Sequence, residues 1–237
     1  MSDRFELVDT YNKNVVIKVI SVSESDNDAV CNLEKQIDDV DFIYLDAIEN
    51  TNIREILNDA NMVFLIGATN DSKLNEIAEI VSDLNILTIA IVTKFLSFDA
   101  KNITQLLCDD LLNSITGITN LIVNAGMINV DLEDIRTVLF GKNTAISGSS
   151  LATGENRAID ATEKVLASSS LFHDVDLKTV SSVLVNIAAA DMTMSEFCDI
   201  GDVIHNNFSK NVRIKLGTSI NPDLGDVIEV SVVVAGF

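Results

Sequence analysis

The stretch from Ile103 to Val138 constrains the fold of this chain more than any other. Its apolar residues recur at steps of three and four, the spacing that places side chains along one stripe of a helix. The residues of the stripe are Ile103, Leu107, Leu111, Ile115, Ile118 and Ile122. A helix of this length spans roughly 33 Å, the width of a small domain. Gly126 can stop it, because glycine readily adopts a positive φ. The pattern therefore predicts one long central helix over residues 101–125.

A polar loop follows the predicted helix and precedes a second one. It reads Asn129-Val130-Asp131-Leu132-Glu133-Asp134. One interpretation makes Asp131 the N-cap of the second helix, where acidic groups are favoured by the helix dipole. A second interpretation, compatible with the first, makes the loop a functional surface.

Charge and cysteine usage narrow the classes of protein. The net charge of −20 and the pI near 4.2 argue against nucleic acid or anionic lipid as a partner, because both are negatively charged. No apolar run reaches the roughly 18 residues of a membrane helix. Cys31, Cys108 and Cys198 are far apart, and neither His173 nor His205 has the spacing of a metal ligand. We expect a cytoplasmic protein with no metal site and no direct membrane contact.

Strand and helix patterns alternate in the first 100 residues and change order afterwards. Strands are expected at residues 14–22, 42–45, 62–66 and 86–92, and helices at 54–60 and 74–84. Beyond the loop, helices are expected at 155–167 and 195–208, and strands at 180–187, 212–217 and 227–235. The alternation predicts an α/β fold with a parallel sheet covered by helices.

Several segments in one order resemble FtsZ, the bacterial tubulin relative. The C-terminal ones read SLATGENRAIDATEKVLASSSL, SVLVNIAAADMTMSEFCDIGDVIHNNF and VRIKLGTSINPDLGDVIEVSVVVAGF. The N-terminal ones read NVVIKVISVSESDNDAVCNL, NMVFLIG and DLNILTIAIVTK. The resemblance implies a tubulin/FtsZ-like two-domain architecture. Residues 1–100 would form a reduced Rossmann-like domain, 101–125 the central helix and 126–237 an α+β C-terminal domain.

The segments that bind GTP in the FtsZ family are the ones that depart from its pattern. The family has a glycine-rich loop after the first strand, but here no glycine precedes Gly67. Glycine lets a phosphate approach the backbone, whereas carboxylates at the same place repel it. The residues at the degenerate loops are Ser21, Ser23, Glu24, Asp26, Asp28, Gly67 and Thr69. By comparison with the family, segments are also missing after Asp46 and after Phe98, the second including a strand.

The resemblance assigns the polar loop to a neighbouring subunit. In the family this loop completes the GTPase site of the next subunit in a filament. Asp131 and Asp134 would help to polarise the attacking water there, and Asn129 would contact the neighbour's nucleotide. Leu132 replaces the family's Phe, and Glu133 replaces a small residue.

These departures lead to two expectations. The first is an FtsZ-like pseudo-GTPase without its own cofactor that acts in cell division as a partner, regulator or end-capper of FtsZ-type filaments. The alternative is a divergent FtsZ that binds GTP and Mg²⁺, hydrolyses GTP and polymerises by itself. On the first expectation the chain is not an enzyme.

Overall fold

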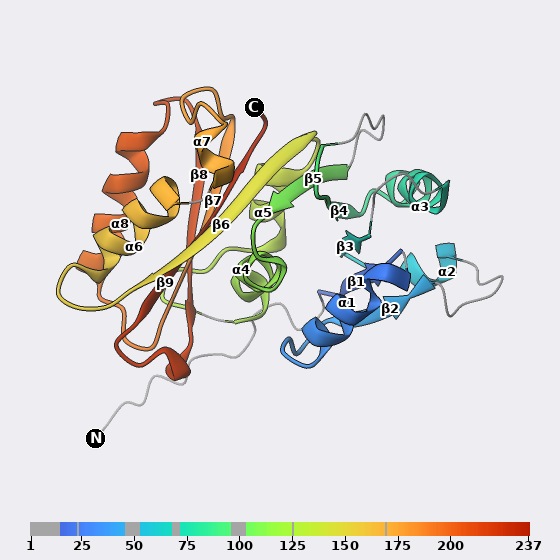
Figure 1. The fold of residues 1–237 in the computed structure, drawn as a ribbon, viewed down its shortest axis with the longest axis horizontal. Helices are drawn as coiled ribbons and strands as arrows, with labels where there is room; N and C mark the ends of the chain where they lie inside the picture. Colours follow the sequence, from blue (N-terminus) through green and yellow to red (C-terminus); the bar gives the residue numbers. More distant parts are fainter. Residues whose placement is uncertain are drawn as a thin grey trace, which may run out of the picture.

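The computed structural model of this protein describes residues 15–22, 24–45, 53–67, 72–95, 103–124, 126–168 and 170–237. Within these ranges nine strands form one continuous sheet in the order β2-β1-β3-β4-β5-β6-β9-β7-β8, with helices on both faces (Figure 1). The predicted α/β class is confirmed. No helix in the described ranges is long and apolar enough to span a bilayer.

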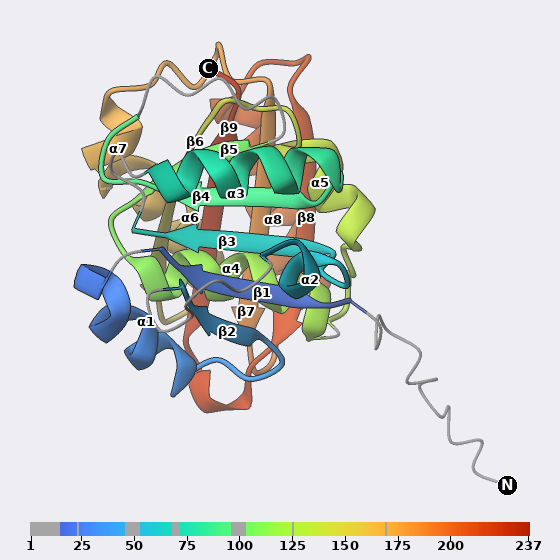
Figure 2. The same cartoon turned by 90° about the vertical axis from the view of Figure 1, so that its right-hand side faces the viewer.

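Parallel strands make up the N-terminal half of the sheet. They are β1 (Ile17–Ser21), β2 (Asp41–Tyr44), β3 (Met62–Ile66), β4 (Leu87–Ile91) and β5 (Ile103–Cys108). The helical segments between them are η1 (Glu24–Asp26), α1 (Asn27–Glu34), α2 (Ile53–Leu57) and α3 (Ser72–Asp83). β1 and β3 are buried along their whole length, which explains why β3 is a continuous apolar run. β1 is interrupted by Lys18, whose ammonium pairs with Asp59. Figure 2 shows β1, β3 and β4 side by side with α3 in front of them.

The C-terminal half mixes parallel and antiparallel pairing. Its strands are β6 (Thr144–Ala152), β7 (Ser182–Ala189), β8 (Arg213–Ile220) and β9 (Ile228–Ala235). Its helical segments are α4 (Leu111–Val123), α5 (Leu132–Leu139), α6 (Arg157–Ser168), α7 (Ser170–His173), α8 (Met194–Asn207) and η3 (Pro222–Leu224). β9 pairs antiparallel with β6 and β7, and β8 pairs parallel with β7. β8 is therefore an edge strand of the sheet.

The core lies on both faces of this sheet. Apolar residues of α1, α4 and α5 pack together on one face, beneath both halves of the sheet. On the opposite face α2 and α3 cover the N-terminal strands, and α6, α7 and α8 cover the C-terminal strands. The sheet is thus the middle of three layers.

The central helix is shorter than the sequence pattern predicts. Residues Ile103–Cys108 form strand β5, and the helix runs only over Leu111–Val123, 13 residues or roughly 20 Å. Ile103 and Leu107 are four residues apart, a spacing that occurs on one face of a helix and also on one side of a strand. The apolar stripe therefore continues through β5 although these residues form no helix. The family strand that we expected to be missing after Phe98 has a counterpart in β5.

Strand β5 joins the N-terminal and C-terminal halves of the sheet. It pairs in parallel with β4 on one side and with β6 on the other, from Gln105↔Thr144 to Cys108↔Ser147. The two halves therefore share one sheet, and α4 is not the only connection between them. The nine-residue strand β6 did not stand out in the sequence, since serine, glycine and threonine make up much of it.

Gly126 serves a different purpose from the predicted helix stop. Helix α4 ends at Val123, and its C-cap is Asn124 in an extended conformation. A Cβ atom on Gly126 would lie 1.9 Å from the carbonyl oxygen of Thr218. The glycine is required because the loop crosses the edge strand β8 at this point.

Candidate functional site

The polar loop between α4 and α5 begins helix α5 with an aspartate cap. Asp131 is the N-cap in an extended conformation, and its carboxylate accepts a hydrogen bond from the backbone N–H of Asp134 at 2.8 Å. The cap interpretation is confirmed. Asp131 is exposed, so the same carboxylate also faces solvent.

Asp134 and Glu133 have basic partners within their own subunit. The Lys215 ammonium on β8 forms an ion pair with the Asp134 carboxylate, and the two side chains are 35% and 32% exposed. Arg136 lies 3.7 Å from the Glu133 carboxylate, donates to the carbonyl of Asn85 at 2.8 Å and covers the Phe140 ring. The acidic groups of the loop are therefore partly neutralised where they lie.

The beginning of the loop is held against β8. Asn129 uses its side-chain oxygen to accept a hydrogen bond from the backbone N–H of Gly126 at 2.8 Å. The backbone N–H groups of Ile128 and Thr218 bond across to the Thr218 hydroxyl and the Ile128 carbonyl. Val130 is buried. The position of the loop is thus set by an edge strand that follows it by about ninety residues of sequence.

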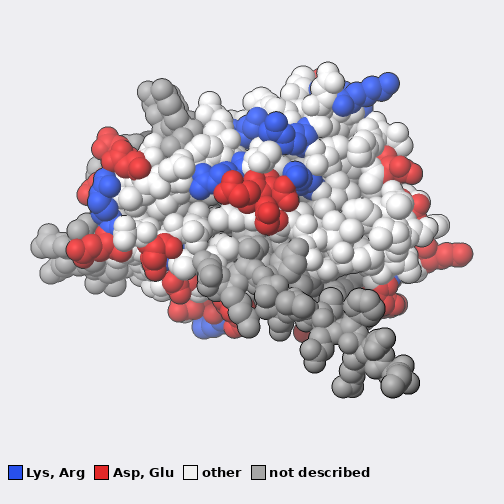
Figure 3. Space-filling model, turned by 180° about the vertical axis from the view of Figure 1, so that it is seen from behind, with Lys and Arg blue, Asp and Glu red and all other residues white. Residues whose placement is uncertain are grey.

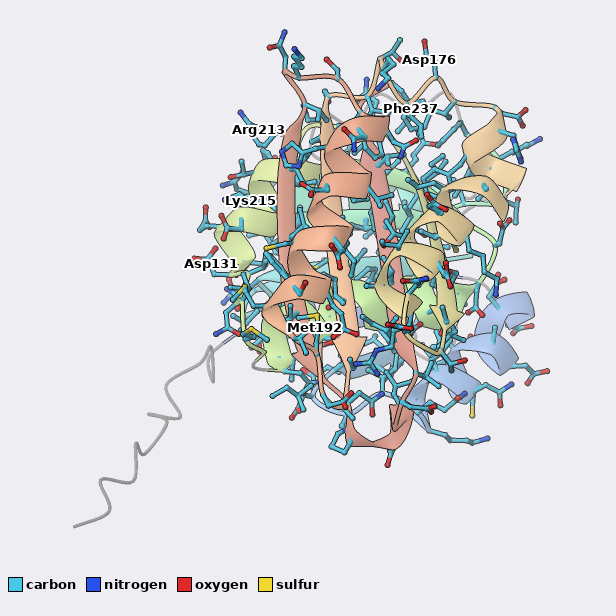
Figure 4. The ribbon with its side chains drawn as sticks, turned by 90° about the vertical axis from the view of Figure 1, so that its left-hand side faces the viewer. Asp131, Asp176, Met192, Arg213, Lys215 and Phe237 are labelled. Carbon is cyan, nitrogen blue, oxygen red and sulfur yellow. The ribbon has the colours of Figure 1, made fainter. Side chains whose placement is uncertain are left out.

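The structure places Asp131 and Asp134 side by side at the start of α5, whereas the side chain of Asn129 is bonded to Gly126 earlier in the loop. Sequence reasoning did not include the basic residues beside them, Arg136, Arg213 and Lys215. Asp131, Lys215 and Arg213 lie along one margin of the molecule (Figure 4). The sequence signal was present, because Arg213 and Lys215 alternate within a predicted strand and so share one face of it.

The second candidate region is the carboxyl edge of β1 and β3. β1 lies between β2 and β3 in the sheet. The connections that follow β1 and β3 therefore leave in opposite directions. Ligands of α/β proteins bind at the carboxyl ends of strands where the connections diverge in this way. The backbone N–H of Val22 donates to the carbonyl of Ile66 at 2.9 Å. Gly67 follows β3 with φ of 95°, a conformation that favours glycine.

Carboxylates, not glycines, follow β1 at this edge. Ser21 is buried, and its hydroxyl lies 2.6 Å from the side-chain oxygen of Asn27. Glu24 and Asp28 are exposed and Asp26 is half-buried, at the start of α1. Two further degenerate-loop residues, Ser23 and Thr69, lie outside the described residues. No three His, Cys, Asp or Glu side chains in the described ranges are grouped to hold a metal ion.

A polar groove of about 380 Å³ lies along α4. Asp38 borders it after α1, Asn113 and Asn120 border it on α4, and Asn221 and Glu229 border it from the C-terminal half. Burial raises the pKa of Glu229, and the charge of Asp110 adds to the effect. Of the degenerate-loop residues that the structure describes, none lines this groove.

Comparison with solved structures defines the class of fold. An FtsZ from M. jannaschii superposes with a TM-score of 0.78 at 19% identity, covering 94% of this chain and 91% of that one. The GDP-bound CetZ1 monomer of Haloferax volcanii superposes with a TM-score of 0.66 at 9% identity, covering 94% of each chain. The fold is therefore that of the tubulin and FtsZ class.

Sequence comparison narrows this class further. Residues 143–237 match the C-terminal domain model of the FtsZ family. The cell division protein FtsZ of Coxiella burnetii is 34% identical over 229 residues, 78% of this chain and 59% of that protein. The cell division protein FtsZ of Pseudomonas putida is 29% identical over 316 residues, 98% of this chain and 79% of that protein. The chain is a divergent FtsZ-like protein.

The chain is shorter than these relatives. Its alignment covers only 59% of the C. burnetii protein. With the P. putida protein the alignment runs over 316 positions although this chain has 237 residues. That relative therefore contains segments between the aligned parts that this chain lacks.

Proposed function

We propose that this protein acts in cell division as an FtsZ-like pseudo-GTPase, a partner of FtsZ-type filaments without its own GTP site. Two properties support the proposal. The edge of β1 and β3 carries carboxylates in the place of a glycine-rich loop, and the polar loop before α5 keeps its acidic groups on the surface.

The single observation that carries the loss of the GTP site is the turn after β1. Ser21 is buried and contacts Asn27, so the first residues of α1 are held close to the strand. Glu24 and Asp28 then place two carboxylates at this turn. Two like charges 4 Å apart repel by about 4 kcal/mol at an effective dielectric constant of 20. A micromolar ligand binds with only about 8 kcal/mol in all, so a triphosphate is poorly accommodated.

The proposed partner surface is the loop with Asn129, Asp131 and Asp134. It docks on the GTP-bearing face of an FtsZ-type subunit, in the manner that the family resemblance implies. The altered edge of β1 and β3 then offers no matching face to a further subunit. A subunit of this kind ends a filament, and small amounts of it shorten polymers.

Two measurements test these statements separately. Titration with a fluorescent GTP analogue and Mg²⁺ should show no saturable binding at micromolar nucleotide, and tight binding would contradict the loss of the site. Light scattering and electron microscopy of FtsZ assembly should show shorter filaments with a small molar fraction of this protein. An Asp131→Arg, Asp134→Arg variant with an unchanged circular dichroism spectrum should restore the length. Normal filaments at equimolar protein, without co-pelleting, would refute end binding.

The alternative is a divergent FtsZ that binds and hydrolyses GTP with Mg²⁺ and polymerises by itself. Gly67 favours it, because this residue keeps a positive φ at the end of β3, beside β1. Under this alternative GTP turnover per molecule rises with protein concentration, and Asp131→Asn abolishes the rise while keeping the helix cap.

A further inference from the structure

The face that carries the acidic loop also carries a cluster of cations. Arg213 and Lys215 are two residues apart on β8, so their side chains leave the same side of the strand. Lys215 reaches Asp134 in the first turn of α5, and Arg213 donates to the Thr137 carbonyl near the end of the helix at 3.1 Å. Arg136 of α5 completes the set. We call Arg136, Arg213 and Lys215 the cationic cluster.

This cluster is unusual for a chain of this charge. The whole sequence has 16 basic and 36 acidic residues. On this face three cations stand beside three carboxylates, those of Asp131, Glu133 and Asp134, so the local charge is balanced. Figure 3 looks at the molecule from behind Figure 1 and shows blue groups bordering a central red group. An anionic partner is repelled less here than by a face with unbalanced carboxylates.

Arg213 has N–H donors beyond the one that is bonded to Thr137. Its side chain is exposed, and among the described residues no carboxylate forms an ion pair with it. The hydrogen bond to Thr137 uses one nitrogen, Nη1. A guanidinium carries five N–H donors in a planar fork that matches the oxygens of a phosphate. Arg136 and Lys215 already have carboxylate neighbours, so Arg213 is the member best placed to take a new anion.

We infer that the cationic cluster is the phosphate-binding part of the docking face, with Arg213 and Lys215 contacting the phosphate groups of the nucleotide on the partner subunit. The inference rests on the proposed function, since the nucleotide belongs to the partner. The cations would also offset the electrostatic repulsion between the three carboxylates of the loop and a triphosphate. Hydrogen bonds from charged N–H groups to phosphate oxygens are charge-assisted, so binding should be tighter to a partner whose nucleotide carries more phosphate charge.

The test measures binding of the full chain to an immobilised FtsZ-type protein prepared with GTP, with GDP and without nucleotide. The wild-type chain should bind the GTP form most tightly. An Arg213→Met, Lys215→Met variant should lose about tenfold in affinity for the GTP form, as expected for a lost charge-assisted bond, and little for the nucleotide-free form. Lys35→Met removes one charge at an exposed residue after α1 and should bind like the wild type.

Each other outcome contradicts a definite statement. If the Arg213→Met, Lys215→Met variant loses equal affinity for all three forms, the cations contact protein carboxylates and the phosphate assignment is wrong. If its affinity is unchanged, the cationic cluster takes no part in docking. A wild-type chain that binds none of the forms would refute the proposed function, and the inference with it. Because Lys215→Met leaves Asp134 without its cation, Arg213→Met alone serves as the variant that breaks no ion pair in the described structure and should still weaken binding to the GTP form.

Discussion

Asp131 and Asp134 are joined by one hydrogen bond, from the Asp134 backbone N–H to the Asp131 carboxylate at 2.8 Å. The two acidic groups therefore have different tasks within their own subunit. Asp131 begins helix α5, and Asp134 pairs with Lys215 across to β8. Any role of the pair toward a neighbouring subunit is added to these structural roles, and variants must separate the two.

Asp131→Ala should lower the free energy of unfolding by about 1 kcal/mol, because the helix loses its cap. Asp131→Asn should keep nearly all of the stability, since the amide oxygen can accept the same bond from Asp134. Urea unfolding followed by circular dichroism measures both. A loss as large for Asn as for Ala would mean that the negative charge, and not the cap, stabilises α5.

Gly126→Ala should be strongly destabilising, by about 2 kcal/mol or more, because the new methyl group would overlap the backbone of Thr218. Gly201→Ala is the matched control. It lies within α8, where a Cβ atom has its nearest neighbour at 3.9 Å, and replacing glycine by alanine in a helix gains up to about 1 kcal/mol. Opposite shifts in thermal melting are expected, and similar shifts would contradict the close approach at Gly126.

Arg157 should be one of the most sensitive charged residues in the C-terminal half. Its guanidinium lies 2.6 Å from the Glu196 carboxylate and 2.9 Å from that of Asp191, and donates to the Asp226 carbonyl at 2.8 Å. Arg157→Leu should cost about 3 kcal/mol of unfolding free energy, because it leaves a largely buried Glu196 without its cation.

The control for Arg157 is the exposed pair Arg54–Asp83, whose side chains are 49% and 68% exposed. Arg54→Leu should change stability by less than about 1 kcal/mol. Adding Glu196→Gln to the Arg157 variant should recover part of the loss, since the charge at the less exposed partner is then removed and only the exposed Asp191 lacks its cation. Equal effects at Arg54 and Arg157 would refute the importance of burial.

Two glutamates should give opposite dependences on pH. The hydrogen bond from Arg157 lowers the pKa of Glu196, so its stabilisation is present above the unfolded pKa and is lost as pH falls through the folded value. Burial raises the pKa of Glu229. Its ionisation therefore costs stability as pH rises from the unfolded toward the folded value.

Glu229→Gln should accordingly raise the free energy of unfolding at pH 7 and have a smaller effect near pH 4, where the carboxyl is already protonated. Glu163→Gln, an exposed residue of α6, is the control and should show little difference between the two conditions. Unfolding curves at both pH values provide the measurement. A stabilisation by Glu229→Gln that is equal at pH 4 and pH 7 would contradict a cost due to ionisation.

The sequence by itself determined most of the elements and the cap of α5. The buried runs that form β1, β3 and β4 are mainly apolar, and α8 begins at Thr193 with a capping box to Glu196. Such signals are local, because a cap or an apolar run depends on residues within a few positions. For the same reason, the N-cap role of Asp131 could be predicted from the sequence.

Only the tertiary structure decided where β5 ends and α4 begins, and that β5 joins the two halves into one sheet. Apolar spacing in Ile103–Cys108 suits a helix as well as a strand, and the choice depends on pairing with β4 and β6. Tertiary structure likewise brought Lys215 to Asp134, 81 residues away in sequence. A contact of this kind is fixed by the order of strands in the sheet and by helix packing. Neither of these can be predicted from the residues near the loop.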